Sequence, residues 1–382
     1  MQWALRLESG TGMRHGAPVC APRRGNCRFT IAITGCWPGM AWCASCWDCL
    51  QQVKQELAME PLGHGIALQF VTRLAEDAAD QAAFISGWQQ DYAQISCGLF
   101  SGRLDELCLG RLQVFREYSA RETFQLCQPW PGSIWFGIPA PGSGERLRFH
   151  GRSVPPAAVL VAMGGSDFSL RTPDDFTIYG VVLEQAVLQQ RHLQLFGRDM
   201  PGAWLQTAAV QLPQASHLAL CRQLGELLAL ARETPDRIGR QLLLDCSADA
   251  LLLALAQALP TTLAGRDSSS QRHWQWVEQA RQRALQPAAR QLTVEDLCRE
   301  LHVTRRTLQN GFQEVTAMSP LPFLRALRLN QVRRLLRSPQ GAADSIQQLA
   351  EDWGFATPSH FSYDYRRLFG ETPSQTRQRP QR

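Results

Sequence analysis

Two groups of polar side chains in the last quarter of the chain have the chemistry to read a DNA duplex. The first group consists of Arg306, Gln309, Asn310 and Gln313. The second group follows at a distance of 53 residues and consists of Ser359, Ser362, Tyr363 and Arg366. Arg, Gln and Asn carry paired donors and acceptors that match the edges of guanine and adenine. Any surface helix carries polar residues opposite its buried stripe, but two groups in matching phase favour base contact over plain solvent exposure.

Each group lies on the second of two short predicted helices. The first helix of each pair has apolar residues at i, i+3, i+4 and i+7, namely Val294, Leu297, Cys298 and Leu301, then Ile346, Leu349, Ala350 and Trp353. The second helix has an inward stripe at i, i+4 and i+7, namely Leu308, Phe312 and Val315, then Phe361, Tyr365 and Leu368. Two short helices joined by a turn, present twice, predict a double helix-turn-helix, which presents its second helices to the major groove.

Residues at the ends of these helices support the prediction. Thr293 with Asp296 predicts a capping box, Thr304 caps the helix that follows, and Thr357-Pro358 begins the last one. Cationic residues beside the two groups are placed for phosphates, which position a protein but specify little sequence. They are Arg305, Arg366 and Arg367.

A single long helix is predicted between the two units, over residues 320–337. Its apolar residues cover most of its circumference, as in a helix that is packed on both sides. Eighteen residues span roughly 27 Å, which is close to the spacing of about 34 Å between successive turns of DNA. The spacer therefore suits two helices that enter neighbouring grooves.

Charge is unevenly distributed along the 382 residues. The segment from 270 to the end holds 17 Arg and 10 acidic residues, giving +7, while the rest of the chain holds 22 basic and 24 acidic residues, giving −2. A basic segment on a mildly acidic body favours a polyanion partner for the C-terminal part. No run of about 18 apolar residues is present, so we expect no membrane span.

Six of the twelve cysteines lie in the first 50 residues, in a stretch without helical or strand periodicity. Cys43-x-x-Cys46-x-x-Cys49 suggests a zinc or iron–sulfur site, and Ile33-Thr34-Gly35-Cys36 suggests a lipoprotein signal with a very short apolar core. A third interpretation is a misplaced start, with translation beginning near Met59. The remaining cysteines are scattered singly, as in a cytosolic protein with reduced thiols.

The middle of the chain predicts a strand-rich domain. Residues 66–96 have helix-like apolar spacing, whereas six short strand-like segments separated by Gly and Pro turns fill 104–183 and predict an antiparallel sheet or partly closed barrel. The strands are expected at 107–118, 133–138, 146–149, 157–163, 168–170 and 176–183. Residues 215–232 and 237–259 predict Leu-rich helices, which are candidates for dimerisation.

The expected fold class is α+β, with a barrel-like sensing domain that carries helices and an all-α double helix-turn-helix domain. We expect an irregular Cys-rich extension at 1–58, an effector-sensing and dimerisation domain at 59–260, a linker at 261–272 and a DNA-binding domain at 273–382.

About 90 residues of the C-terminal part closely resemble the arabinose-regulator (AraC-type) transcription factors. The resemblance rests on Leu292 to Phe312, Ser319 to Leu336 and Ile346 to Pro373, with the runs Ala350-x-x-x-Gly354-Phe355, Phe361-x-x-x-Tyr365-Arg366-x-x-Phe369-Gly370 and Thr372-Pro373-Ser374. It implies base contacts by seven residues, which are Arg306, Gln309, Asn310, Ser359, His360, Ser362 and Tyr363.

Three residues depart from the AraC-type pattern. His302 stands where a turn glycine is common, Gly311 lies inside the first recognition helix, and Asp364 adds an acid near the second. A glycine inside a helix costs about 1 kcal/mol relative to alanine. These departures bear on the strength of DNA binding.

Three runs in the strand-rich part resemble the N-terminal part of ethanolamine-operon regulators. They are Val114-Phe115-Arg116-Glu117-Tyr118, Trp135-Phe136-Gly137-Ile138-Pro139-Ala140 and Thr172-Pro173-Asp174-Asp175-Phe176-Thr177-Ile178. The resemblance implies ethanolamine and adenosylcobalamin as effectors. An ammonium ligand needs aromatic faces and a carboxylate, and the candidates are Glu117, Tyr118, Trp130, Trp135, Asp174 and Asp175. The same aromatics also suit a plain core, and the two aspartates also suit a turn.

The sequence therefore predicts a transcription regulator, an activator that responds to a small molecule and is not an enzyme. Promoter DNA, RNA polymerase and a second copy of the chain are the candidate partners, and the cytoplasm is the expected compartment. The eight histidines are scattered without a His-x-His pair, which argues against a metal-dependent cupin enzyme, and no phosphate loop or nucleophile elbow is present, so we expect no catalytic residues. Two alternatives stay open: a DNA-repair regulator that accepts a methyl group on a zinc-bound cysteine, and a ligand-binding module without DNA affinity.

Overall fold

The computed structural model describes residues 69–379 except for 143–145, 203, 205–207, 234–239, 257–267, 287–291 and 342. The predicted Cys-rich extension at 1–58, with its zinc, iron–sulfur, signal and start-site interpretations, lies outside the described residues. Most of the predicted linker, 261–267, lies outside them as well.

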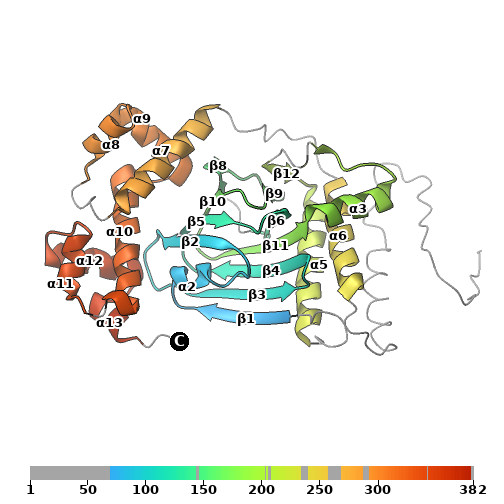
Figure 1. The fold of residues 1–382 in the computed structure, drawn as a ribbon, viewed down its shortest axis with the longest axis horizontal. Helices are drawn as coiled ribbons and strands as arrows, with labels where there is room; N and C mark the ends of the chain where they lie inside the picture. Colours follow the sequence, from blue (N-terminus) through green and yellow to red (C-terminus); the bar gives the residue numbers. More distant parts are fainter. Residues whose placement is uncertain are drawn as a thin grey trace, which may run out of the picture. The chain divides into compact units, whose positions relative to one another are not determined.

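Twelve strands of the described part form two antiparallel sheets (Figure 1). The first sheet has the order β1-β3-β4-β11-β6-β9-β12, and the second has the order β2-β5-β10-β7-β8. The first consists of β1 (Gln69–Ala75), β3 (Gly102–Cys108), β4 (Leu112–Ser119), β6 (Ser133–Pro139), β9 (Ala158–Met163), β11 (Phe176–Glu184) and β12 (Ala209–Gln211). The second consists of β2 (Gln89–Gln94), β5 (Thr123–Gln128), β7 (Arg148–Phe149), β8 (Arg152–Ser153) and β10 (Phe168–Thr172).

The two sheets share an aromatic core but do not close. Trp135 of the first sheet stacks on Phe168 of the second with ring centroids 4.4 Å apart, and Trp88 meets both rings edge-on at 6.0 Å. The expectation of a partly closed barrel is therefore wrong, while the α+β class with an antiparallel strand-rich part is confirmed. The regular spacing of short strands in the sequence indicates that the strands pair. It does not indicate which strands form the edges of each sheet.

The prediction of helix over residues 66–96 is also wrong. This segment contains β1, a five-residue helix α2 (Ala78–Ala82) and β2. Its large apolar residues form two groups, Phe70 with Leu74 and Phe84 with Trp88 and Tyr92, each spaced by four residues. An interval of four is a multiple of the strand period of two as well as the spacing of a helical turn. The predicted strand at 107–118 is two strands, which are separated by a turn where Gly110 takes a φ of +70°.

Helices cover one face of the first sheet. They are α3 (Gln185–Phe196), α5 (Gln214–Glu233) and α6 (Arg240–Ala256), of which α5 contacts β1, β3 and β4. The leucine stripe of α5 is buried within the chain, with Leu220 fully buried and Leu224 2% exposed. The stripe on α5 is thus core within this chain, and the expectation of a homodimer stays a prediction.

The C-terminal part is helical, as the sequence predicts. Its helices are α7 (Ser268–Ala284), α8 (Val294–Glu300), α9 (Arg305–Thr316), α10 (Pro320–Arg337), a 3-10 turn η2 (Pro339–Gly341), α11 (Ile346–Asp352), α12 (Pro358–Phe369) and α13 (Pro373–Gln378). Helix α10 has the predicted bounds and joins the two helix-turn-helix units (Figure 1). Ser268–Ser270, expected in the linker, instead begin α7.

One face of α10 contacts the strand-rich part through a pair of reciprocal hydrogen bonds. The backbone N–H of Gln94 on β2 donates to Asn330 Oδ1 at 3.0 Å, and Asn330 Nδ2 donates to the Gln94 carbonyl at 2.9 Å. Gln94 Nε2 also donates to the carbonyl of Leu368 at 2.8 Å, which ties β2 to the end of α12.

A buried cation, Arg333 on α10, completes this contact. Its guanidinium forms an ion pair with Asp77, which precedes α2, and donates to Glu371 Oε1 at 2.7 Å. It also lies 4.6 Å over the ring of Phe369. Burial raises the pKa of Asp77, but the charge of Arg333 outweighs that effect and lowers the pKa below its usual value. Arg337 adds a second ion pair to Asp77 at 3.2 Å.

No helix among the residues described here is both long and apolar enough to cross a membrane.

Asp77→Asn is expected to lower the free energy of unfolding by about 3 kcal/mol, because it removes a charge that compensates a buried guanidinium. Urea denaturation followed by tryptophan fluorescence measures the loss. Asp344→Asn, at an exposed acid, is the matched control and should change stability by less than about 0.5 kcal/mol. Equal effects of the two substitutions would contradict the role given to Arg333.

Candidate nucleic-acid interface

Helix α9 separates a buried stripe from a polar face. Leu308 and Phe312 are fully buried and Val315 is 2% exposed, as their spacing predicts. The predicted contact residues of this helix are all exposed; they are Arg305, Arg306, Gln309, Asn310 and Gln313. Gly311 is buried against α7, with Trp276 and His273 3.4 and 3.5 Å from where its Cβ would lie. The departure at Gly311 therefore faces a neighbouring helix and not the polar face.

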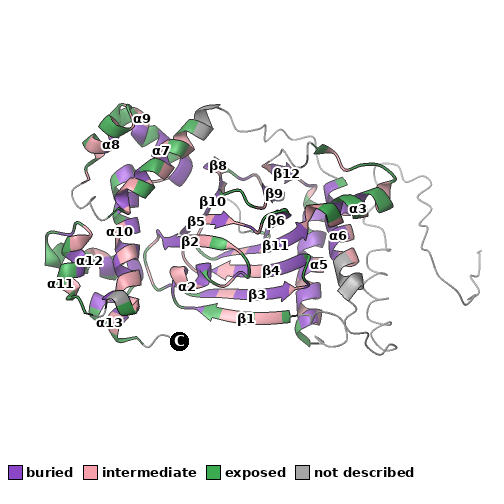
Figure 2. Cartoon of the chain, viewed as in Figure 1, coloured by how far each residue is buried: buried purple, intermediate pink, exposed green. Residues whose placement is uncertain are grey.

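Helix α12 repeats this division. Phe361, Tyr365 and Leu368 are buried, and the predicted contact residues are again all exposed (Figure 2). They are Ser359, His360, Ser362, Tyr363, Arg366 and Arg367. Tyr363 is 66% exposed.

Side-chain caps fix where α8 and α9 begin. Thr293 and Asp296 form the predicted capping box of α8, in which Asp296 N donates to Thr293 Oγ1 at 3.1 Å. Thr304 accepts from the N–H of Thr307 at 3.1 Å at the start of α9. Thr357 does stand at the cap position of α12, followed by Pro358, but its side chain makes no cap hydrogen bond.

The turns of the two units have different residues at the position that takes a left-handed backbone. His302 ends the turn after α8 with a φ of +53°, and Gly354 occupies the matching position after α11 with a φ of +84°. The left-handed region costs a residue with a Cβ about 1–2 kcal/mol, and glycine avoids that cost. The first unit therefore holds a strained histidine where the second has the residue suited to the turn.

The acid near the second polar face is neutralised. Asp364 of α12 forms an ion pair with Arg325 of α10, and the Arg325 guanidinium lies 5.8 Å over the ring of Phe355. Asp364 therefore anchors α12 to α10. On the first unit, Arg305 forms an exposed ion pair with Glu295 at 2.9 Å, a contact that a phosphate can replace at little cost.

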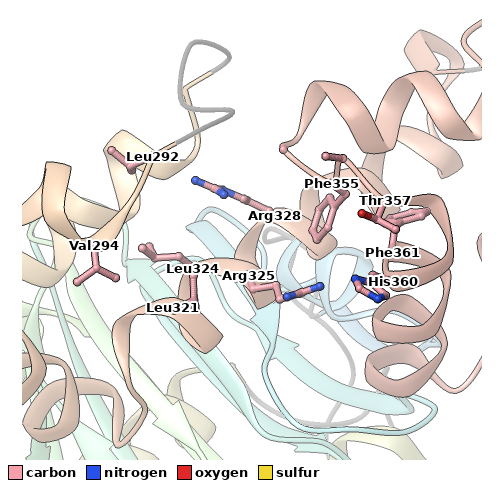
Figure 3. A pocket seen from close by; sticks show the side chains of 12 residues that line it. Leu292, Val294, Leu321, Leu324, Arg325, Arg328, Phe355, Thr357, His360 and Phe361 are labelled. Atoms are coloured by element: carbon pink, nitrogen blue, oxygen red, sulfur yellow. The ribbon is translucent and has the colours of Figure 1, made fainter.

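A pocket of about 200 Å³ opens between the two units (Figure 3). Leu292 and Val294 line it at the start of α8. On the side of α12 it is lined by Gly354, Phe355, Ala356 and Thr357, which precede this helix, and by His360 and Phe361 in its first turn. Its floor is the first half of α10, with Arg325 and Arg328 among the lining residues. Figure 3 shows the side chains of Arg325 and His360 pointing toward each other.

Comparisons with known proteins agree with this geometry. Residues 297–379 match a family model described as a helix-turn-helix domain. The regulator CdhR of Pseudomonas aeruginosa is 38% identical over 86 residues, and the activator RhaS of Escherichia fergusonii is 40% identical over 73 residues. Residues 297–379 are therefore a helix-turn-helix domain similar to those of transcription regulators. From the resemblance of its sequence motifs, we refer to the helical C-terminal part as the AraC-type domain.

The similarity to these curated relatives covers a short part of each chain. The alignments cover 22% of this chain and 25% of CdhR, and 19% of this chain and 25% of RhaS. Among solved structures, the AraC-like activator CuxR aligns with 68% of this chain and 86% of its own at 15% identity, with a TM-score of 0.29. The chain thus spans about a quarter of the length of these curated relatives.

The predicted ligand residues of the strand-rich part are not gathered in one place. Glu117 and Trp135 are both buried, but β11 aligns Glu117 with Pro139 and Gln113 with Trp135. Four positions of strand separate the two levels by roughly 13 Å. The indole Nε1 of Trp135 has no hydrogen-bond partner within the described part of the chain.

The other four predicted ligand residues lie at the edges of this part. Asp174 accepts from Ser96 Oγ at 2.5 Å and from the N–H of Glu122 at 2.9 Å, which is a turn contact. Tyr118 interacts with Asp175, and Trp130 is half-buried beside the aromatic core. The alternative interpretation of the two aspartates as turn residues fits their surroundings.

Glu117 has a site of its own, which includes two residues that sequence reasoning missed. Gln81 Nε2 donates to Glu117 Oε1 at 2.7 Å, and the hydroxyl of Tyr92 donates to Oε2 at 3.4 Å. Burial raises the pKa of Glu117 to about 7 in spite of both hydrogen bonds. Gln81 lies in a segment that was predicted as a long helix, so its sequence gave no sign of a contact with Glu117.

Metal ligands do not cluster in the part of the chain that the structure describes, where no three His, Cys, Asp or Glu side chains are placed to hold an ion. The Cys43, Cys46 and Cys49 motif lies outside that part.

His302→Gly is expected to stabilise the AraC-type domain by about 0.5–1 kcal/mol, because it removes the left-handed strain and pays only the greater chain entropy of glycine. Gly354→Ala introduces the same strain in the second unit and should destabilise by about 1 kcal/mol. Thermal unfolding of both variants measures the pair of opposite shifts. A destabilised His302→Gly variant would show that the histidine side chain contributes more than its backbone costs.

Proposed function

We propose that the chain regulates transcription by binding a specific DNA sequence with α9 and α12. The observation that supports this most strongly is the pair of exposed polar faces, which stand at matching positions on the second helix of each unit. The residue types differ between the two units, but polar and exposed side chains occupy the same four positions of both helices. The basic charge of the segment from residue 270 onward agrees with a polyanion partner.

The exposed residues divide into two roles. Arg306, Gln309 and Asn310 are proposed to contact base edges from α9, together with Gln313 at the end of that face. On α12, Ser359, His360, Ser362 and Tyr363 take this role, and short side chains there leave less scope for paired hydrogen bonds. Arg305, Arg366 and Arg367 are proposed to contact phosphates and so to set the register on the duplex.

We also propose that the protein is an activator that responds to a small molecule bound in the strand-rich part. RhaS is named as a transcriptional activator, which agrees with activation of transcription by this chain. Ethanolamine, with adenosylcobalamin as a second effector, is the first candidate because of the resemblance in three sequence runs. The buried carboxylate of Glu117 offers an ammonium group a counter-charge.

A route from this site to the DNA-binding domain supports the proposal. Gln81, which donates to Glu117, belongs to α2. Asp77 at the start of the same short helix pairs with Arg333, and Asp80 accepts from Arg337 at 2.6 Å. Because α2 has only five residues, a shift of Gln81 on ligand binding moves the acids that hold α10.

Arg306→Ala is expected to weaken binding by about 1–3 kcal/mol at one base position, whereas Arg367→Ala should lower the salt slope of binding by about 1 without changing sequence preference. Fluorescence anisotropy with a duplex selected in vitro and its single-base variants, over a range of salt concentrations, measures both. Equal losses for Arg306→Ala on selected and scrambled DNA would refute the base-reading role.

Ethanolamine binding is expected to strengthen about tenfold per pH unit between pH 5 and 7 and to level off above pH 7. An ammonium ligand needs the ionised carboxylate, and Glu117 in the folded protein becomes ionised only as the pH rises through its pKa of about 7. Calorimetry at several pH values measures the slope. Glu117→Gln should abolish the pH dependence, and an unchanged slope in that variant would assign the ligand elsewhere.

A further inference from the structure

The pocket between the two helix-turn-helix units combines apolar walls with cationic groups. Leu292, Val294, Leu321, Leu324 and Phe355 supply the apolar surface. Arg325, Arg328 and His360 supply the groups that attract an anion, and none of the twelve lining residues is acidic. Asp364, which is not a lining residue, already forms an ion pair with Arg325. The pocket therefore suits an occupant with an anionic group next to apolar surface.

The position of the pocket between the two units indicates which molecule occupies it. The pocket is lined by the start of α8 on one side and by the start of α12 on the other, with the first half of α10 between them (Figure 3). His360 is at once a lining residue and part of the exposed face of α12. A duplex whose successive major grooves receive α9 and α12 must carry a sugar–phosphate strand across the space between them.

The chemistry of that strand matches the lining. A phosphodiester has two charged oxygens flanked by deoxyribose rings, and these rings present C–H surface to leucine and phenylalanine side chains. An arginine pairs with phosphate through two parallel hydrogen bonds, and its weak hydration suits a partly enclosed site. Burial lowers the pKa of Arg328 from its usual value, so an anion brought beside it gains more than it would at an open surface.

We propose that this pocket binds one backbone phosphodiester of the DNA, midway between the two recognition helices, through Arg328 and Arg325. The proposal rests on the proposed function and adds a phosphate site that lies on the connecting helix α10 instead of on either recognition helix. Such a contact fixes the spacing of the two grooves without reading a base. Arg325 also remains tied to Asp364, so the phosphate and α12 are positioned by the same side chain.

The test uses the full chain and a duplex selected in vitro by it, in which single phosphates are replaced in turn by uncharged methylphosphonates. One central position is expected to weaken wild-type binding about five- to tenfold. Arg328→Gln should weaken binding of the unmodified duplex by a similar factor, lower the salt slope by about 1, and lose nothing further at that central position. Arg328→Lys should restore most of the salt slope.

Arg299→Gln is the matched control, because Arg299 is an exposed arginine of α8 that lies outside the pocket and pairs with Asp296. The central methylphosphonate should weaken DNA binding by Arg299→Gln by the same factor as binding by the wild type. If Arg328→Gln also keeps the full loss there, the phosphate proposal is overturned. If a thermal unfolding experiment shows that Arg328→Gln is unfolded, the methylphosphonate series measured with the wild type and with Arg328→Lys tests the phosphate proposal instead.

Two further outcomes separate this inference from others. No duplex selected by the wild-type chain would sink the proposed function, whereas a selected duplex with no sensitive central phosphate would sink this inference alone. Saturable binding of sodium benzoate to the free protein, lost in Arg328→Gln, would overturn the proposal by assigning the pocket to a small acid. Absence of benzoate binding together with the methylphosphonate effect supports DNA as the occupant.

Discussion

The buried guanidinium of Arg333 is the interaction on which the rest of the structure depends. It faces Asp77 of the strand-rich part and Glu371 of the AraC-type domain, and all three side chains are at most 6% exposed. A charge buried to this degree persists only when its partners are in place, since the loss of one partner costs several kcal/mol. The hydroxyl of Thr376, which accepts from Arg333 at 3.2 Å, adds a further constraint. The position of α10 is therefore specified by both parts of the chain.

That constraint gives α10 two functions. One face is docked on β2 and α2, and the other carries Arg325 and Arg328 toward the pocket. A helix fixed in this way keeps the two units at a set distance and angle. Because Gln81 and Asp77 belong to the same short helix, the surroundings of Glu117 and those of Arg333 are joined by a few residues. In the function that we propose, this arrangement gives an effector a short physical path to the spacing of α9 and α12.

The sequence predicted the AraC-type domain far better than the strand-rich part, for physical reasons. Helix bounds follow from local periodicity and caps, so 320–337 and the outward position of Arg306 were correct. Strands depend on partners far along the chain, and an interval of four in 66–96 fits either period. Glu117 was found through its run of residues, but Gln81 was not, because their contact joins positions 36 residues apart. Arg328 was not singled out from the sequence, because the many apolar residues of its helix indicated packing on both sides and drew attention away from its arginines.

The two units are built for different tasks. The first has Arg306, Gln309 and Asn310 on its recognition helix, side chains with paired hydrogen-bonding groups, but its turn is strained at His302. The second has shorter polar groups, yet Asp364 ties it to Arg325, and Tyr365 donates to Thr376 at 2.9 Å beside Arg333. In the DNA complex that we propose, the rigid attachment of α12 to α10 lets the second unit set the register on the duplex. Base discrimination in that complex falls mainly to α9, because its side chains are longer.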